Sequence, residues 1–505
     1  MPIRTEILAS FYQDSVVLMR VASQIRTRPG VREAAAFMGT PSNHGLLEQI
    51  GLATAESKGA RPNDLILTVD AESDAAAVAA LAAAKELLAQ RRQASEAGAE
   101  VRPRTLESAL RMLPGANLVA ISVPGAYAKF EVMKAIKRGL HVFLFSDNVP
   151  LQDEIDLKTE AVKRGVLCMG PDCGTAYLNG IGVGFTNVVP RGRIGCVAAA
   201  GTGLQAVASR IAALGEGISH GIGVGGRDLS AEVGGAMTLF ALEALAKDPS
   251  TEAIVIISKP PHPTVLPRLE AAIAKIRTPV VACVLGAQAP PRSAAMWVET
   301  LDSAADAVVA ALARRTATRQ PFSNPAEMRT RLARVHAGGP IAPSVFGLYT
   351  GGTLAHEAHL LLDALLGNGA GERILDLGDD RYTVGRPHPM IDPQVRTDMI
   401  LKAGEEEAGV LLLDLVLGRG SHPNPAAPLA DAVRRATATA EASGRRMVAV
   451  ASVVGTAGDP QDVAGQVAQL QEAGIEVLPS NAEAVRFAAL LVNPALAGRL
   501  LETSR

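Results

Sequence analysis

Two glycine-rich turns stand where this chain could hold an anion. The first lies within residues 195–204 (GCVAAAGTGL), after an apolar run. The second lies within residues 345–354 (VFGLYTGGTL), also after an apolar run. Each turn is followed by a helical pattern, and the first N–H groups of a helix are unpaired and lie at the positive end of its dipole. One such turn is equally typical of an ordinary strand–helix connection. Two of them favour a phosphate or carboxylate site between two helix ends.

Three histidines follow predicted strand ends and could handle a proton. They are His262 in KPPHP, His388 in RPHP and His422 after RGS. A loop histidine can act as general acid or base or bind a phosphate oxygen, and it can equally be structural. We expect the three rings on the side of the sheet where ligands bind, because ligands of parallel sheets lie at the carboxyl ends of the strands.

Charged side chains near these loops allow further roles. Arg227 could bind a carboxylate with two hydrogen bonds, although Arg227 and Asp228 could equally cap a helix. Loop aspartates such as Asp379 could hold a divalent ion, but helix caps are commoner, so no metal site is predicted. Cys173 could be reactive at a helix end, and packing is the simpler interpretation.

Composition excludes several classes of protein. The chain has 505 residues, enough for about three or four domains. A net charge of −2 argues against broad binding of nucleic acid or anionic membranes. The four cysteines form no CxxC pair, and no apolar run approaches the roughly 20 residues of a membrane span. We therefore expect a reduced, cytoplasmic protein.

Alternating strand and helix patterns predict an α/β fold with parallel sheets. A small α/β unit is expected over residues 1–90 and a βαβαβ unit over residues 104–190, with a linker at 91–103. An internal repeat follows, with copies at 191–315 and 341–505 separated by a polar linker at 316–340. Each copy carries one glycine turn after its first strand, so both turns are expected to face the same crevice.

These motifs resemble those of a known family. GPDCG at residues 170–174 resembles the GPNCPG segment of the succinyl-CoA synthetase α subunit, and residues 344–454 are similar to the carboxyl-terminal ligase domain of the β subunit. The loop DLGDDRYTVGRPHPMIDP at 376–393 resembles the FdrA family of acyl-CoA synthetase-like proteins most strongly. The resemblance implies a partial Rossmann-like CoA-binding domain followed by two flavodoxin-like ligase domains, with a small α/β amino-terminal domain.

Three departures from the synthetase pattern bear on function. Residues 280–301, where the α subunit carries its phosphorylated histidine, contain no histidine. The segment 316–340 stands where the β subunit has an ATP-grasp domain, and the glycine-rich first half of the CoA-binding domain has no counterpart. ATP use, a phosphohistidine relay and CoA binding therefore each lose a part, and CoA is a doubtful cofactor.

The resemblance also implies a set of site residues. The synthetases grip the phosphate of the phosphohistidine with two helix ends, and the matching positions here are Ala200, Gly201, Thr202, Gly203, Thr350, Gly351, Gly352 and Thr353. We expect catalytic roles for His262, His388, His422 and Arg227. Substrate contacts are expected from Pro171, Asp172, Cys173, Asp228, Asp379, Asp380, Arg381, Arg386 and Asp392.

The FdrA resemblance implies a subunit of an oxamate carbamoyltransferase in purine (allantoin) degradation. It would use phosphate or carbamoyl phosphate as substrate and act with YlbE-like and YlbF-like partner subunits. Two alternatives remain open, an ADP-forming acyl-CoA synthetase and a non-catalytic scaffold.

Overall fold

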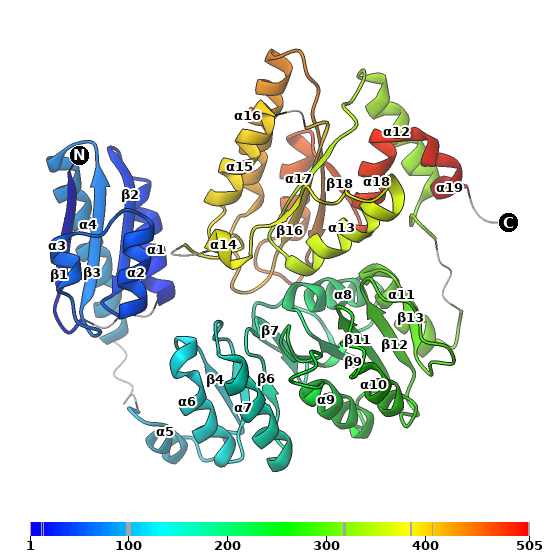
Figure 1. The fold of residues 1–505 in the computed structure, drawn as a ribbon. Helices are drawn as coiled ribbons and strands as arrows, with labels where there is room; N and C mark the ends of the chain where they lie inside the picture. The colour runs from blue at the N-terminus through cyan, green and yellow to red at the C-terminus, as the bar shows by residue number, and fades with distance from the viewer. Residues whose placement is uncertain are drawn as a thin grey trace. The chain divides into compact units, whose positions relative to one another are not determined.

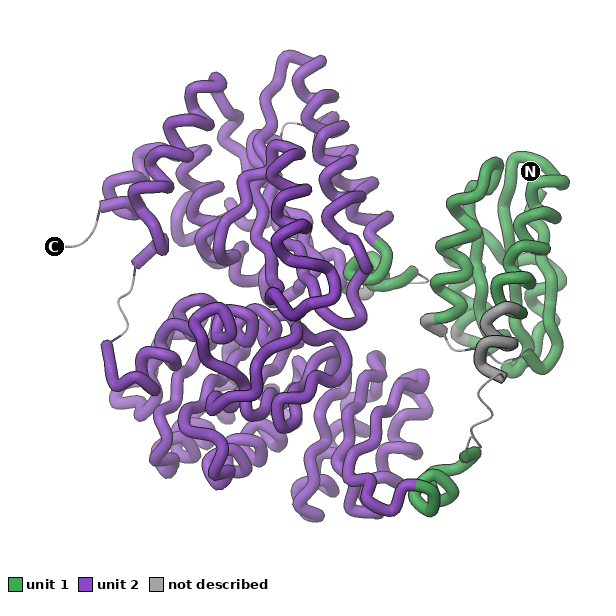
Figure 2. The backbone as a smooth tube through the Cα atoms, turned by 180° about the vertical axis from the view of Figure 1, so that it is seen from behind, with its two compact units in different colours: residues 1–112, 379–392 green, residues 113–378, 393–505 purple. Residues whose placement is uncertain are grey.

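The structure is a computed structural model that describes residues 2–11, 13, 15–96, 103–316, 320–383, 386–406 and 408–502. The chain forms two compact units, one of residues 1–112 with 379–392 and one of residues 113–378 with 393–505 (Figure 2). Both units mix helices and strands, so the predicted α/β class is confirmed.

The first unit is built on an antiparallel sheet. β1 (Ile3–Leu8) and β2 (Val31–Met38) both pair with the central strand β3 (Leu65–Ala71), giving the order β1-β3-β2 (Figure 1). The expectation of parallel sheets does not hold for this unit. Helix α1 (Ser15–Arg26) connects β1 to β2, and β3 lies between these two strands and runs antiparallel to both.

Helices cover both faces of this small sheet. Apolar residues of α1 and α4 (Asp74–Glu96), such as Val21 and Ala80, pack on one face. Leu47 of α2 (Pro41–Gln49) packs against Ile66 on the other face, and α3 (Ala55–Lys58) follows. The linker predicted at 91–103 is helical as far as Glu96, and its residues 97–102 lie outside the described residues.

The second unit holds three sheets. A small parallel sheet has the order β4 (Leu118–Ile121), β5 (His141–Leu144), β6 (Cys168–Met169). Its helices are α6 (Gly125–Lys137) and α7 (Leu151–Arg164), and α5 (Leu106–Met112) precedes it in the chain.

The largest sheet has seven strands. Their order is β13 (Met296–Val298), β12 (Val280–Val284), β11 (Ala253–Ser258), β9 (Arg191–Ala198), β10 (Ile218–Gly223), β7 (Thr175–Leu178), β8 (Ile181–Gly184). Its helices are α8 (Gly201–Ala213), α9 (Ala236–Lys247), α10 (Leu266–Ile273) and α11 (Leu301–Leu312). The predicted boundary at residue 190 cuts this sheet, because the hairpin β7–β8 pairs with β10.

The third sheet is parallel and has five strands. Their order is β15 (Ile374–Asp376), β14 (Val345–Tyr349), β16 (Val410–Val416), β17 (Val448–Val454), β18 (Glu476–Leu478). Its helices are α13 (Gly352–Leu366), α15 (Gln394–Glu405), α16 (Ala426–Ala442), α17 (Val463–Glu472) and α18 (Asn481–Val492). Every residue of β11 and β16 is buried, as expected for parallel strands covered on both faces.

One further helix and three short helical elements complete the described fold. They are α12 (Pro325–Ala337), α14 (Asp380–Thr383), η1 (Pro494–Leu496) and α19 (Ala497–Leu501). The linker predicted at 316–340 therefore contains a helix, which begins because Asn324 accepts the Glu327 N–H and a proline occupies the first helical position. Within the described ranges, none of the helices combines the length and apolar composition needed to span a bilayer.

Candidate functional site

Helix α8 begins without a side-chain cap. Its N-cap residue, Ala200, is extended and has no side-chain oxygen that could accept an N–H bond. Within the described part of the chain, no hydrogen bond engages the N–H groups of Gly201, Thr202 and Gly203. These three donors are therefore open to an external acceptor.

Helix α13 begins in the same way but its turn is held from behind. The Asp414 carboxylate on β16 accepts the N–H groups of Thr350 and Gly351 at 2.9 and 2.8 Å and contacts the Thr350 hydroxyl at 3.1 Å. Thr350 and Gly351 therefore do not offer free N–H groups to a phosphate, and any contact with one would have to come from other atoms of these residues. Gly352 and Thr353 remain available, since no hydrogen bond of the described residues engages their N–H groups.

Asp414 is itself balanced by a buried cation. Arg396 of α15 donates from Nη1 to the Asp414 carboxylate at 3.0 Å, and its side chain is only 4% exposed. Burial lowers the pKa of Arg396. A buried carboxylate without this partner would be strongly unfavourable, so the pair and the turn it holds form one structural element.

The two helix starts lie against each other. A Cβ added to Gly203 would lie 2.9 Å from Thr353 Cγ2 and 3.3 Å from Thr353 Oγ1, and one added to Gly351 would lie 3.0 Å from the Thr202 Cβ. Thr353 is 6% exposed and its hydroxyl has no hydrogen-bond partner in the structure. The structure thus brings together the two glycine turns, as the repeat predicts, and aims an unpartnered hydroxyl at their junction.

One carboxylate limits the charge that this junction can hold. A Cβ on Gly352 would collide with the carboxylate of Asp376, the last residue of β15. Asp376 also accepts the Gly378 N–H at 2.9 Å. Its negative charge beside the start of α13 opposes anion binding there, so the α8 donors are the stronger half of the junction.

The three predicted catalytic histidines share a local structural role. Each precedes a proline, and each ring Nδ1 accepts the N–H of the second residue along the chain, at 3.3 Å in His262, 3.2 Å in His388 and 3.1 Å in His422. No hydrogen bond of the described residues joins these rings to the helix starts. The geometry therefore shows them in tight turns and assigns none of them a proton-transfer role.

Arg227 and Asp228 take part in one ion network, in which Asp228 is buried and the Arg227 side chain is 46% exposed. The Lys158 ammonium lies 2.8 Å from Asp228 and 2.7 Å from Glu154, and Arg227 contacts Glu154 at 2.8 Å. Asp228 also accepts the N–H groups of Met237 and Thr238 at the start of α9. The capping alternative is thus the one observed, and the network ties α7 to the seven-stranded sheet.

The GPDCG segment is buried at Pro171 and Cys173. Burial raises the pKa of the Cys173 thiol to about 12, and its Sγ points to the Thr175 carbonyl oxygen. Pro171 is buried against Gly225, whereas Asp172 is exposed. A buried thiol with a raised pKa is a poor nucleophile, which agrees with packing as the simpler interpretation of Cys173.

The loop 379–392 belongs to the first unit. Asp392 accepts hydrogen bonds from Arg26 at 2.9 Å and Ser23 at 3.2 Å, both on α1. Burial lowers the pKa of His388 to about 4. Asp392 therefore holds this loop against α1 of the amino-terminal unit. The sequence predicted a substrate contact for Asp392 and not this structural contact.

The other charged residues predicted as substrate contacts in that loop are exposed, except Asp380, whose side chain is not among those described. Asp379 accepts the Arg381 N–H at 3.1 Å, and Arg381 stacks over Tyr382. Arg386 is exposed, and nothing is described of the Asp380 side chain. Among the described residues, no cluster of three histidine, cysteine or acidic side chains could hold a metal ion.

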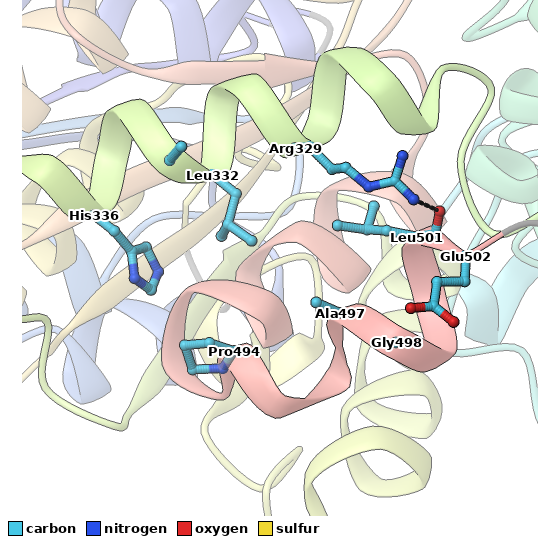
Figure 3. A pocket seen from close by; sticks show the side chains of 9 residues that line it. Arg329, Leu332, His336, Pro494, Ala497, Gly498, Leu501 and Glu502 are labelled. Carbon is cyan, nitrogen blue, oxygen red and sulfur yellow. Dashed lines mark hydrogen bonds between the residues drawn. The ribbon is translucent and has the colours of Figure 1, made fainter.

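A separate cavity lies near the carboxyl terminus. It has a volume of about 360 Å³ and lies between α12 and the η1–α19 segment, lined by residues such as Leu332, His336 and Pro494 (Figure 3). Arg329 crosses one end and donates to the Leu501 carbonyl oxygen. None of the predicted site residues lines this cavity.

Comparison with known proteins places the chain in a family. Residues 1–104 match the family model "AllF, heavy metal-associated domain", and residues 348–491 match the model "CoA-ligase". The protein YahF of Escherichia coli (strain K12) is 36% identical over 506 residues, which is 95% of this chain and 97% of YahF. The chain belongs to the FdrA family of acyl-CoA synthetase-like proteins, together with YahF.

More distant relatives of this FdrA-family chain are CoA ligases. The α subunit of an ADP-forming succinate–CoA ligase from Methanothermobacter thermautotrophicus is 29% identical over 178 residues, and that of Aquifex aeolicus is 28% identical over 183 residues. The chain spans 59% of the length of each of these two subunits. The structure of a dinucleotide-forming acetyl-coenzyme A synthetase from Ca. Korarchaeum cryptofilum matches this chain with a TM-score of 0.31 and 15% sequence identity. The match covers 77% of this chain and 85% of the synthetase chain.

The heavy-metal name of the first family model does not fit the residues present. Soft metal ions are held by cysteine thiolates, and all four cysteines of the chain lie beyond residue 104, at Cys168, Cys173, Cys196 and Cys283. His44 is the one histidine of residues 1–104, and its Nε2 contacts the Ala60 carbonyl oxygen. Residues 1–104 therefore lack the thiolate donors that such a metal requires.

Proposed function

We propose that this chain transfers an acyl group between phosphate and an acceptor, in the manner of the acid–thiol ligases. The observation that carries the proposal is the junction of α8 and α13, where open N–H groups and the unpartnered Thr353 hydroxyl converge. Backbone donors at helix starts suit a phosphate group without requiring a lysine. The ligase relatives support the class of reaction.

In the proposed step a phosphate oxygen attacks the acyl carbon of a thioester. The carbon–sulfur bond breaks, the thiolate leaves, and an acyl phosphate remains. Negative charge develops on the carbonyl oxygen during the attack, and fixed N–H donors at a helix start stabilise such charge. Gly201, Thr202 and Gly203 are the donors that we assign to the oxyanion, since no carboxylate of the described residues occupies them.

A second candidate is carbamoyl transfer, with a ureido acid such as oxalurate in place of the thioester. The histidine-free segment 280–301 favours it, because phosphate can then enter directly and no phosphohistidine is needed. The products would be oxamate and carbamoyl phosphate. We further propose that the protein is cytoplasmic, since its four cysteines are unpaired, and that YlbE-like and YlbF-like partners complete the active complex.

Arsenolysis distinguishes these candidates. Arsenate replaces phosphate, and the acyl arsenate hydrolyses by itself, so the chain with its partners should release free CoA thiol from succinyl-CoA or acetyl-CoA. Release of oxamate and ammonia from oxalurate would instead select the carbamoyl reaction. If neither substrate reacts although the complex assembles, the scaffold alternative is the correct one.

A further inference from the structure

The anion junction is shared by two sheets, so its geometry depends on what holds α8 and α13 together. Helix α11 contacts both. Arg210 of α8 is paired with Asp306 of α11 at 3.0 Å, and the first amide of α11, Leu301 N–H, donates to Glu357 of α13 at 2.7 Å. Helix α11 therefore connects the two helices whose starts form the junction.

Glu357 lies one helical turn after Thr353 and is buried, with 1% of its surface exposed. Its second carboxylate oxygen accepts Asn481 Nδ2 of α18 at 2.8 Å. Asn481 in turn donates to the Leu354 carbonyl oxygen at 3.0 Å and accepts the Tyr349 hydroxyl at 3.0 Å. One carboxylate thus joins α11, α13 and α18 directly behind the start of α13.

We propose that Glu357 is a positioning residue, which aligns the start of α13 with that of α8 so that both present their donors to one anion. This inference rests on the proposed anion site. Glu357 does not touch the anion. It acts through Leu301 N–H and Asn481, whose bonds fix the direction in which α13 leaves the sheet.

The surroundings of Glu357 make its charge state sensitive to pH. Burial, together with Asp302 of α11, raises the pKa of Glu357 to about 7, while the Leu301 N–H, Asn481 and Arg486 of α18 act in the opposite direction. Cys283 of β12 and Tyr349 of β14 also face this carboxylate, and their pKa values are raised by burial, so both are neutral. Only the ionised carboxylate accepts both N–H bonds, so alignment should be lost as the pH falls below about 7.

Sulfate is the probe that separates alignment from simple charge repulsion, because sulfate does not titrate between pH 5.5 and 8.5. We expect the full chain to bind sulfate about fivefold more weakly at pH 6 than at pH 8 by calorimetry. Glu357→Gln should bind about five- to tenfold more weakly than the wild type at pH 8 and show no such pH dependence. Direct repulsion between Glu357 and the anion would produce the opposite sign in both measurements.

Glu483→Gln is the matched control. Glu483 is also buried and lies on α18, but it accepts Ser323 N–H and does not contact α13 through a hydrogen bond. Its sulfate affinity should equal that of the wild type. Hydrogen exchange without sulfate should show faster exchange of Leu301 N–H and of the α13 start in Glu357→Gln only.

The outcomes are distinguishable. If Glu357→Gln binds sulfate as tightly as the wild type, or more tightly, the positioning role is overturned and the anion site stands. If the wild type binds no sulfate or phosphate, the anion site is overturned and the role of Glu357 falls with it. Unchanged exchange at Leu301 and the α13 start in Glu357→Gln would also contradict the proposal.

Discussion

The two copies of the internal repeat begin with the same strand, glycine turn and helix, yet their turns are stabilised differently. In the first copy Ala200 caps α8 without any side-chain acceptor. In the second, Asp414 binds the Thr350–Gly351 turn and Asp376 lies beside Gly352. The difference indicates that the first turn supplies the unpaired N–H donors. The Thr350 and Gly351 N–H groups of the second turn are bonded to Asp414, so that turn is held rigidly.

The histidine turns differ between the copies as well. His262 of the first copy is exposed, whereas His388 of the second is half-buried within the amino-terminal unit. All three His-Pro turns use the ring Nδ1 as an acceptor. Burial lowers the pKa of His388 to about 4, so the His388 ring is neutral near pH 7.

The largest expected effect comes from removing the Asp414 carboxylate, which holds the second turn. Asp414→Ala leaves Arg396 buried and unpaired and should lower the free energy of unfolding by about 3–5 kcal/mol, measured by urea denaturation. The double variant Asp414→Leu/Arg396→Met should recover much of the loss. Asp379→Ala, at an exposed position, serves as the control and should have almost no effect. A single variant as stable as the wild type would contradict the role of Asp414.

Separating the two turns should come next. Gly203→Val places atoms against Thr353 and Ile257, where even a Cβ lies at 2.9 and 3.1 Å. We expect sulfate affinity to fall more than about tenfold, with a stability loss of about 1–3 kcal/mol from overpacking. Gly498→Ala in α19 meets no atom within 4 Å and should leave sulfate affinity unchanged without lowering stability. Unaltered sulfate binding in Gly203→Val would show that the junction is not the anion site.

Acid should reveal the difference between the histidine turns. The pKa of His388 is about 4 in the folded chain and about 6.5 when unfolded, so its contribution to stability is complete above pH 6.5 and is lost as the pH falls toward 4. His388→Gln should therefore lose about 1–3 kcal/mol less than the wild type between pH 7 and 4.5. His262→Gln, at an exposed turn, should follow the wild type. Equal pH dependence in all three proteins would contradict the buried, neutral state of His388.

The smallest expected effect concerns the Thr353 hydroxyl. Thr353→Val keeps the shape of the side chain and removes a buried hydroxyl that has no partner, so stability should stay within about 0.5 kcal/mol of the wild type or rise slightly. Sulfate affinity should fall about three- to tenfold if this hydroxyl binds the anion. Thr68→Val, whose hydroxyl pairs with Thr5, is the contrasting change and should lower stability without altering sulfate binding.

Local pattern was a good guide to many elements. The apolar periodicity of residues 15–26, 31–38 and 151–164 indicates α1, β2 and α7 directly. Helix α12 was missed because residues 316–340 are polar, and a helix held by one narrow apolar stripe, here Met328 and Val335, resembles a linker in composition. The hairpin β7–β8 was missed because its two strands have only four residues each.

The candidate site divides along the same line. Both glycine turns are local signals, since a strand, a glycine and a helix follow one another within ten residues. Asp414 can be recognised in the sequence as a charged residue within the apolar run VLLLDLV. Its partner Arg396 lies 18 residues away, and no spacing rule predicts that the two side chains pair. The catalytic roles of the three histidines stay predictions, because their residue type and place after strands suggested them while their hydrogen bonds show only tight turns.

The sequence by itself determined the α/β class, the repeat, the family and the two turns, because these depend on residue type and on periodicity over short stretches. Tertiary structure decided which N–H groups stay open. Asp414 and Asp376 reach the second turn from strands distant in sequence, and a buried carboxylate acts on whichever donor the fold places within about 3 Å of it. That distance is a property of the packed sheets, and residue order alone does not contain it.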